Sequence, residues 1–285
     1  MCFLRIVLCL GCLWMGACVK VPPPEPPPEL AVFCILSPGD SLLTVTLSRV
    51  VRVGERFRLD SVVTVSNAEV VLAEGIRMVR LTFSPRHRRY EARNADFVKP
   101  DAEYRLTVRL PGQPPLLARF TVPSVCPVLA TNGGFVGEDY VFSVDWMDIA
   151  GQKNYYYLTG VVEGGIPGRP LNGQVTVGTV GVSWGSGANS RLFSTDQGRD
   201  GQRQYSPEGL IRKAGRATDP LVMQLVLQNM DKAYFEYGQK GFGRIDTDDG
   251  LISRFKEPIL VESNVENGLG IFSAYTRQTV RVRIR

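Results

Sequence analysis

Apolar and polar residues alternate with a period of two over most of residues 30–122, and no other feature of this 285-residue chain constrains its fold as strongly. Between residues 104 and 110, Tyr, Leu, Val and Leu occupy every second position and are separated by Arg, Thr and Arg. Alternation of this kind is typical of strands with one buried face. Candidate strands lie at residues 30–36, 43–47, 61–65, 69–73, 78–83, 89–93, 103–110 and 116–122. Short strands at this spacing, with no convincing helix, predict an immunoglobulin-like or fibronectin-like β-sandwich over residues 30–123.

The segment Pro100-Asp101-Ala102-Glu103-Tyr104 is typical of the start of the penultimate strand of such a sandwich. At this point a tyrosine hydroxyl bonds back to the preceding corner, so we expect Tyr104 to do so. The fold by itself says nothing about activity, although its edge strands could dock a partner.

Residues 128–285 predict a second, less regular β-rich domain. Alternation at Tyr140–Met147, the run Tyr155–Leu158, and strong patterns at 221–228 and 280–284 indicate strands. A glycine-rich region from Gly160 to Gly215, with candidate strands at 174–184, otherwise suggests long loops, which makes it the first place to expect a recognition surface. One short helix is expected near residues 230–237, with Asn229 as its N-cap, Asp231 in its first turn and Gly238 as its stop. The whole chain is thus predicted to be mainly β.

The first 29 residues predict export and a lipid anchor. Arg5 precedes an uncharged, mostly apolar run from Ile6 to Gly16, which is too short for the roughly 20 apolar residues that a membrane span needs. Residues 1–17 therefore read as a signal peptide, and the small residues before Cys18 indicate a lipoprotein whose Cys18 thiol carries a diacylglycerol. An ordinary secreted protein cleaved elsewhere is the alternative.

Residues 18–29 contain six prolines within Pro22–Pro28, which exclude both a helix and a central strand. Such a segment favours a semi-rigid polyproline II tether that holds the folded part away from the bilayer. A ligand for a proline-recognition module is the alternative.

Cys34 and Cys126 are the two cysteines that remain after the signal peptide and Cys18 are set aside. In an exported protein they could form a disulfide that joins the ends of the first domain, or they could be two buried free thiols. The sequence leaves both alternatives open.

Composition and motifs offer little support for an enzyme. The charged content is ordinary, and the formal net charge of +5 does not require nucleic acid as a partner. The single histidine, His87, lies within a basic Arg-His-Arg-Arg stretch that reads as a solvated turn. No Gly-x-Ser-x-Gly elbow of the strand-to-helix kind is expected to supply a nucleophile, and one histidine without paired thiols does not fit a zinc site.

The remaining polar and aromatic clusters also have simpler explanations. Asp246–Gly250 departs from the spacing of an EF-hand loop, and Asp196, Asp200 and Gly201 are typical turn formers. The aromatic groups at Tyr155–Tyr157 and Tyr234–Tyr237 could stack on a sugar or peptide, but their spacing favours core packing. We therefore expect no cofactor and no metal, and a carboxylate-dependent hydrolase is the least favoured hypothesis.

Two stretches, Met230–Tyr237 and Ser263–Tyr275, stand out as a pair. Together with the lipoprotein signal, Leu30–Leu36, Thr44–Ser48 and Tyr104–Val108, they resemble a family of Bacteroidota lipoproteins known as domain of unknown function 4249. Between Gly238 and Asp249 the chain departs from the family pattern, with a shorter helix and a different connection. The matching positions are Asp231, Tyr234, Tyr237, Asn264, Asn267, Gly268, Gly270, Phe272 and Tyr275.

The resemblance implies an outer-membrane lipoprotein, facing either the surface or the periplasm, that accompanies a TonB-dependent transporter in nutrient uptake. It supplies no catalytic residues. The leading hypothesis is therefore a lipid-anchored binding or accessory protein. A stand-alone structural or adhesive protein of the cell envelope is the alternative.

Overall fold

The computed structural model describes residues 30–49, 64–163, 180–181, 183–184, 191–212, 214–217, 220–245 and 262–284. The predicted signal peptide, Cys18, the proline tether and the Asp246–Gly250 turn lie outside these residues. Most of the candidate strands at 61–65 and 174–184 do so too.

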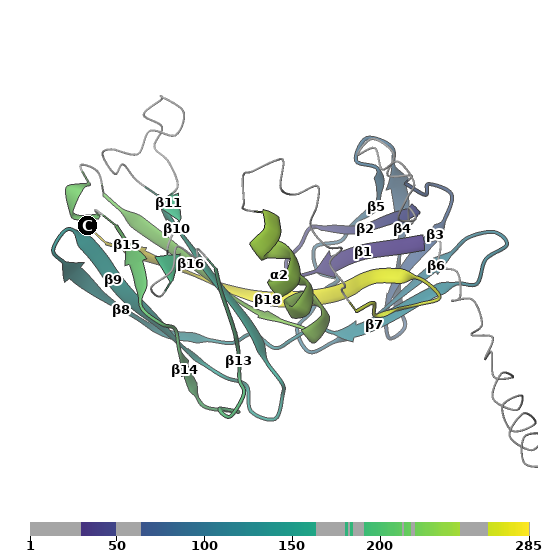
Figure 1. Ribbon diagram of the computed structural model, residues 1–285. Coiled ribbons are helices and arrows are strands. Elements are labelled where there is room, and N and C mark those ends of the chain that lie inside the picture. The colour runs from purple at the N-terminus through teal and green to yellow at the C-terminus, as the bar shows by residue number, and fades with distance from the viewer. Residues whose placement is uncertain are drawn as a thin grey trace, which may run out of the picture.

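The protein is mainly β, as predicted, and it is elongated, with two β-rich halves side by side (Figure 1). The N-terminal half comprises the described residues between 30 and 122, and the C-terminal half comprises the described residues between 126 and 245. The last strand, β18 (Leu269–Arg283), runs through both halves.

The strands of the N-terminal half match the sequence pattern closely. They are β1 (Leu30–Leu36), β2 (Leu42–Arg49), β3 (Glu69–Glu74), β4 (Arg77–Ser84), β5 (Arg89–Arg93), β6 (Glu103–Arg109) and β7 (Leu116–Thr121). Antiparallel pairing gives the order β1-β2-β5-β4-β3-β6-β7. Every second residue is buried in β2 and β6, so the alternation in sequence is the alternation between core and solvent.

The predicted tyrosine corner is confirmed. The hydroxyl of Tyr104 donates to the carbonyl oxygen of Phe97 at 2.7 Å and accepts from the backbone N–H of Lys99 at 2.9 Å. The side chain is fully buried, so these two bonds satisfy a hydroxyl that would otherwise be costly to enclose.

The C-terminal half consists of two sheets with a hydrophobic core between them. One sheet contains β10 (Tyr155–Glu163) and β16 (Val222–Met230), with β11 (Val180–Gly181) and β13 (Arg191–Thr195) on the other side of β10. The second sheet is built around β9 (Asp139–Met147). Its other members are β8 (Val128–Val136), β12 (Ser183–Trp184), β14 (Arg203–Tyr205) and β15 (Gly209–Ile211), and a 3-10 turn at Ala214–Arg216 follows β15.

Strand β18 connects the halves through its backbone. Its residues 269–274 pair in parallel with β1, and its residues 275–283 pair antiparallel with β16. The two-residue strand β17 (Val265–Glu266) pairs with β7, and both β7 and β17 contact β18, so the sheet of the N-terminal half curls back on itself. Because Val265, Phe272 and Ala274 are part of its core, the sandwich predicted for residues 30–123 is completed by the far end of the chain.

The linker between the halves is fixed by buried polar side chains. The carbonyl oxygen of Ser124 accepts from the amide of Asn229 at 3.1 Å and from the hydroxyl of Thr276 at 2.8 Å. The Asn229 amide also donates to Asn154 at 2.7 Å. Since Asn229 and Thr276 are both buried, these bonds hold the linker against both strands that meet there.

The helix differs from its prediction. Helix α2 (Lys232–Ile245) has 14 residues, its N-cap is Asp231 rather than Asn229, and it continues past Gly238. Asn229 still belongs to β16, where its side chain bonds to the linker. Glycine lowers helix propensity by only about 1 kcal/mol, so a helix that packs on a sheet can continue past it.

Replacement of Gly270 by alanine should strongly destabilise the protein. Gly270 has φ +121°, and an added Cβ would lie 1.9 Å from the carbonyl oxygen of Val32 on β1. We expect Gly270→Ala to cost more than about 3 kcal/mol, because it combines backbone strain with a clash against the backbone.

Chemical denaturation of the variant measures this loss. Gly134→Ala on β8 is the matched control, since an added Cβ there meets nothing within 4 Å. Equal stability of Gly270→Ala and the control would show that β1 and β18 do not lie as close as described.

Candidate functional site

The residues of the two family-like stretches converge where α2 meets β18. Asp231 caps the helix, because its carboxylate accepts the N–H of Tyr234 at 2.9 Å. The backbone N–H of Asp231 donates to the carbonyl oxygen of Ala274 at 3.1 Å, and the buried hydroxyl of Ser273 donates to its carboxylate. One side chain therefore fastens the helix to the connecting strand.

Burial raises the pKa of Asp231 to about 6. The Ser273 hydroxyl and the backbone N–H groups of Tyr234, Ala274 and Ala233 favour the carboxylate and oppose this rise. Desolvation is the larger effect, so Asp231 titrates in the folded protein well above an ordinary aspartate.

The side chain of Asn264 pairs with the backbone of β18 at Phe272, as a neighbouring strand would. Its side-chain amide donates to the carbonyl oxygen of Phe272 at 2.6 Å, and its side-chain oxygen accepts the N–H of Phe272 at 2.9 Å. Both backbone groups of Phe272 are thus satisfied while its ring packs 4.4 Å from the ring of Phe120.

Asn267 and Gly268 form the turn between β17 and β18. Asn267 has φ 60° and its amide donates to the carbonyl oxygen of Pro115 at 2.9 Å. A Cβ on Gly268 would lie 2.7 Å from a methyl group of Leu116, so this turn packs closely on the start of β7.

The aromatic residues of these stretches pack against neighbouring rings. Tyr234 lies 5.7 Å from Tyr275, and Tyr237 lies 5.6 Å from Phe33. Tyr155, Tyr157, Met230 and Phe235 form a small buried cluster, and Tyr234 and Tyr275 pack against it. The expectation that these aromatic groups serve mainly as core therefore agrees with their contacts.

Two pockets flank α2. A polar pocket of about 350 Å³ lies at the start of the helix, and its lining includes Arg119, Asp231, Lys232, Glu236, Glu262 and Asn264. A smaller apolar pocket of about 210 Å³ is lined by residues that include Val32, Phe33, Thr46, Tyr237 and Ile271. The polar pocket carries side chains of both charges, which suits a neutral polar ligand better than a strongly charged one.

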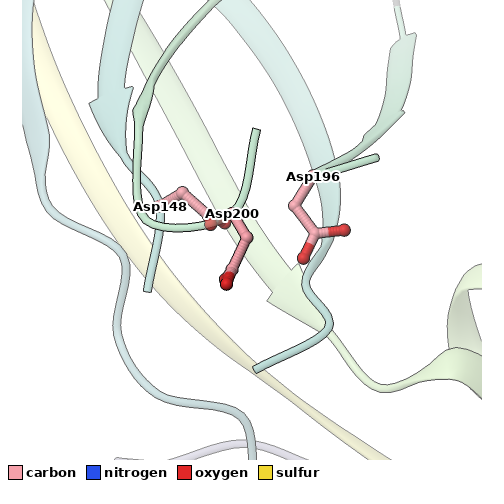
Figure 2. A group of neighbouring side chains, drawn as sticks. All are labelled: Asp148, Asp196 and Asp200. Atoms are coloured by element: carbon pink, nitrogen blue, oxygen red, sulfur yellow. The ribbon is translucent and has the colours of Figure 1, made fainter. Parts of the chain in front are cut away.

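Asp148, Asp196 and Asp200 form a cluster that sequence analysis did not assemble, because Asp196 and Asp200 were interpreted as separate turn residues and Asp148 was not singled out. One carboxylate oxygen from each lies within 4.8 Å of the others (Figure 2). Carboxylate oxygens can bind calcium. Here, however, they accept hydrogen bonds from the N–H groups of Gly201, Asn154 and Gly151 and from the hydroxyl of Tyr156. These bonds tie together the loops that contain the three aspartates.

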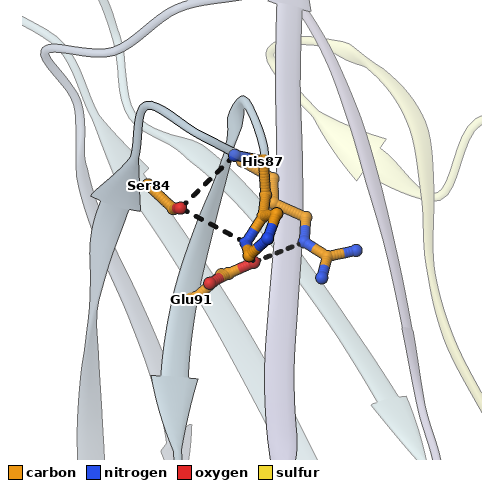
Figure 3. A network of polar contacts seen from close by, with 4 residues as sticks. Ser84, His87 and Glu91 are labelled. Carbon is orange, nitrogen blue, oxygen red and sulfur yellow. Dashed lines mark hydrogen bonds and ion pairs between the residues drawn. The ribbon is translucent and has the colours of Figure 1, made fainter.

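His87 lies in an exposed turn, as predicted, and belongs to a polar network with Ser84 and Glu91 (Figure 3). Its Nδ1 is 2.9 Å from the Glu91 carboxylate and 3.4 Å from the Ser84 hydroxyl. A catalytic triad needs the acid and the serine on different ring nitrogens. Because both approach the same nitrogen here, this network does not activate Ser84 as a nucleophile.

Cys34 and Cys126 are free, buried thiols in the structure, which is the second of the two alternatives. They belong to the cores of different halves. The Cys126 thiol lies 3.8 Å from the Tyr156 hydroxyl, and burial raises the pKa of both thiols, to about 12 for Cys126. Neither is prepared to act as a nucleophile.

Comparison with protein families finds a match to the domain of unknown function named DUF4249 over residues 19–281. The chain belongs to this family. The match covers both halves, β18 up to residue 281 and all the residues that converge at α2. The family resemblance noted in the sequence is therefore confirmed.

Comparison with solved structures gives weak similarities. A proposed carbohydrate binding protein from Bacteroides uniformis ATCC 8492 matches with a TM-score of 0.21 and 8% identity, over 72% of this chain and 90% of that one. A DUF3823 family protein from Parabacteroides merdae ATCC 43184 matches with a TM-score of 0.17 and 11% identity, over 71% and 92% of the two chains. With TM-scores this low, neither similarity bears on the function of this chain. Comparison with curated proteins found no match.

No helix in the described part of the chain is both long enough and apolar enough to cross a membrane.

Substitution of Asp231 by asparagine should change how stability depends on pH. The folded-state pKa of about 6 is above the ordinary value of 3.8, so the folded state holds the proton more tightly. The stability of the wild-type protein should therefore fall as pH rises from about 4 to about 6, by about 1.4 kcal/mol for each pH unit. Asparagine keeps the cap but cannot titrate, so Asp231→Asn should become more stable than wild type above pH 6.

Denaturation curves at pH 4 and pH 7 test this effect, with Asp231→Ala as the variant that loses the cap and about 1 kcal/mol. If Asp231→Asn were as unstable as Asp231→Ala at pH 7, the negative charge itself would be the stabilising feature.

Proposed function

We propose that this protein is a lipid-anchored binding protein of the outer membrane that serves as an accessory to a TonB-dependent transporter in nutrient uptake. The family resemblance suggests the transporter, and the lipoprotein signal that ends at Cys18 suggests the anchor. The protein would act by binding and not by catalysis, without a cofactor.

The shape of the molecule carries the proposal. Strand β1, where the described part of the chain begins, lies in the N-terminal half, and the C-terminus lies at the far end of the C-terminal half (Figure 1). Cys18 is 12 residues before Leu30. A polyproline II segment of that length spans about 35 Å, so a lipid on Cys18 would leave the N-terminal half nearer the bilayer and the C-terminal half farther from it.

Local chemistry supports binding over catalysis. Neither the Ser84, His87 and Glu91 network nor the buried thiols have the geometry or pKa of a nucleophile. The polar pocket at α2 is our candidate for the cargo site, because charged side chains of both signs line it and could orient a polar ligand.

Replacement of Cys18 by alanine tests the anchor and the partnership together. In cells given labelled palmitate, the wild-type protein should take up label and co-purify in mild detergent with a TonB-dependent barrel. Cys18→Ala should lose the label and the membrane association, because the thiol that carries the lipid is absent.

Cys34→Ala is the matched control, since it removes a thiol that has no role in anchoring. Labelled protein that purifies without a barrel would contradict the partnership and favour the stand-alone structural or adhesive alternative. Label that persists in Cys18→Ala would contradict the anchor site.

A further inference from the structure

Strand β8 forms an open edge of the C-terminal half. Within the described residues it pairs with β9 alone, over the register Val128 to Val136. Two other strands of this sheet, β14 and β15, also pair with β9. Each of them has three residues, whereas β8 has nine. A long row of backbone N–H and C=O groups therefore lacks a strand partner in the described part of the protein.

The pairing of β8 is irregular between Val128 and Ala130, as at a β-bulge, but the rest of this edge has few of the features that normally prevent sheets from associating. Natural edge strands are commonly short, charged or interrupted by proline. The sequence of β8 is VLATNGGFV, with no charged residue and no proline. Three of its apolar side chains are substantially exposed: Leu129 by 46%, Phe135 by 45% and Val136 by 68%.

The neighbours of β8 define what could pair with it. The ring of Phe135 lies 5.3 Å from that of Tyr140 in an edge-to-face arrangement, and Gly133 leaves the space that the Tyr140 side chain occupies. An added strand would therefore meet the exposed ring of Phe135 on this face, whereas Tyr140 is buried. Only another extended backbone offers donors and acceptors at the spacing of the open edge.

We propose that β8 docks an extended, uncharged and apolar-rich segment of another protein by β-strand addition. This inference rests on the proposed lipid anchor and makes the mode of partnership specific. In this arrangement the backbone of β8 provides most of the binding affinity through hydrogen bonds, and the side chains around Phe135 determine which segments bind.

A second copy of the chain fits this edge less well. β8 begins beside β18, where the N–H of Val128 donates to Gln278, and it runs away from the N-terminal half (Figure 1). Two copies that paired antiparallel through β8 would direct their N-terminal halves in opposite directions. Anchors on both copies in one membrane would oppose that arrangement.

Photo-cross-linking in cells tests the proposal. Benzoylphenylalanine in place of Phe135 should form an adduct with one other protein, and mass spectrometry should place the linkage in a single uncharged segment. The same probe in place of Leu117 is the control, because Leu117 is 37% exposed on β7 but pairs on both sides, with β6 and β17.

A synthetic peptide of the cross-linked sequence then measures binding to the purified protein. Phe135→Lys should weaken that binding at least tenfold, and Leu117→Lys should leave it unchanged, with both variants matching wild type in thermal midpoint. An adduct with a second copy, or peptide binding unaffected by Phe135→Lys, would overturn the proposal. The proposal would also be overturned if no adduct formed at position 135 in membranes from which the barrel still co-purifies with the protein. In that case the proposed function would stand.

Discussion

The backbone pairing of β18 with both β1 and β16 is the interaction on which the rest of the structure depends. Residues 269–274 complete the N-terminal half, and residues 275–283 complete a sheet of the C-terminal half. The two halves thus share one continuous strand. The linker between them is fixed at Ser124 by side chains from β16 and β18. The relative position of the two halves is consequently set by hydrogen bonds and not only by side-chain packing.

The residues on which the family resemblance was based serve this connection. Asp231 joins the helix to β18, Asn264 satisfies the backbone of Phe272, and Gly270 allows close approach to Val32. These roles are structural, and they explain why such different residue types occur together in two short stretches. The polar pocket lies beside the same residues, so any ligand bound there would contact the joint between the halves.

Local pattern was sufficient to predict most strands and the tyrosine corner, because burial of alternate residues and the Tyr104 hydroxyl bonds are determined by nearby residues. The parallel pairing of β1 with β18 could not be predicted in this way, since it joins residues more than 230 positions apart and leaves no local signal. The helix was placed correctly but made too short, because packing outweighs the cost of Gly238. The Asp148, Asp196 and Asp200 cluster was missed for the same reason as the pairing: only the tertiary fold brings its members together.

The early position of β1 in the chain has a consequence for folding. When β1 has been synthesised, its neighbour β2 follows at once, but its other partner lies in residues 269–274. Pairing over so long a separation is slow, because the loop must close before the contacts contribute. If the chain is exported N-terminus first, as proposed, its N-terminal half would remain incomplete until residues 269–274 had also emerged. In the proposed exported protein, the fold would thus delay completion of the N-terminal half until the start of β18 had crossed the membrane.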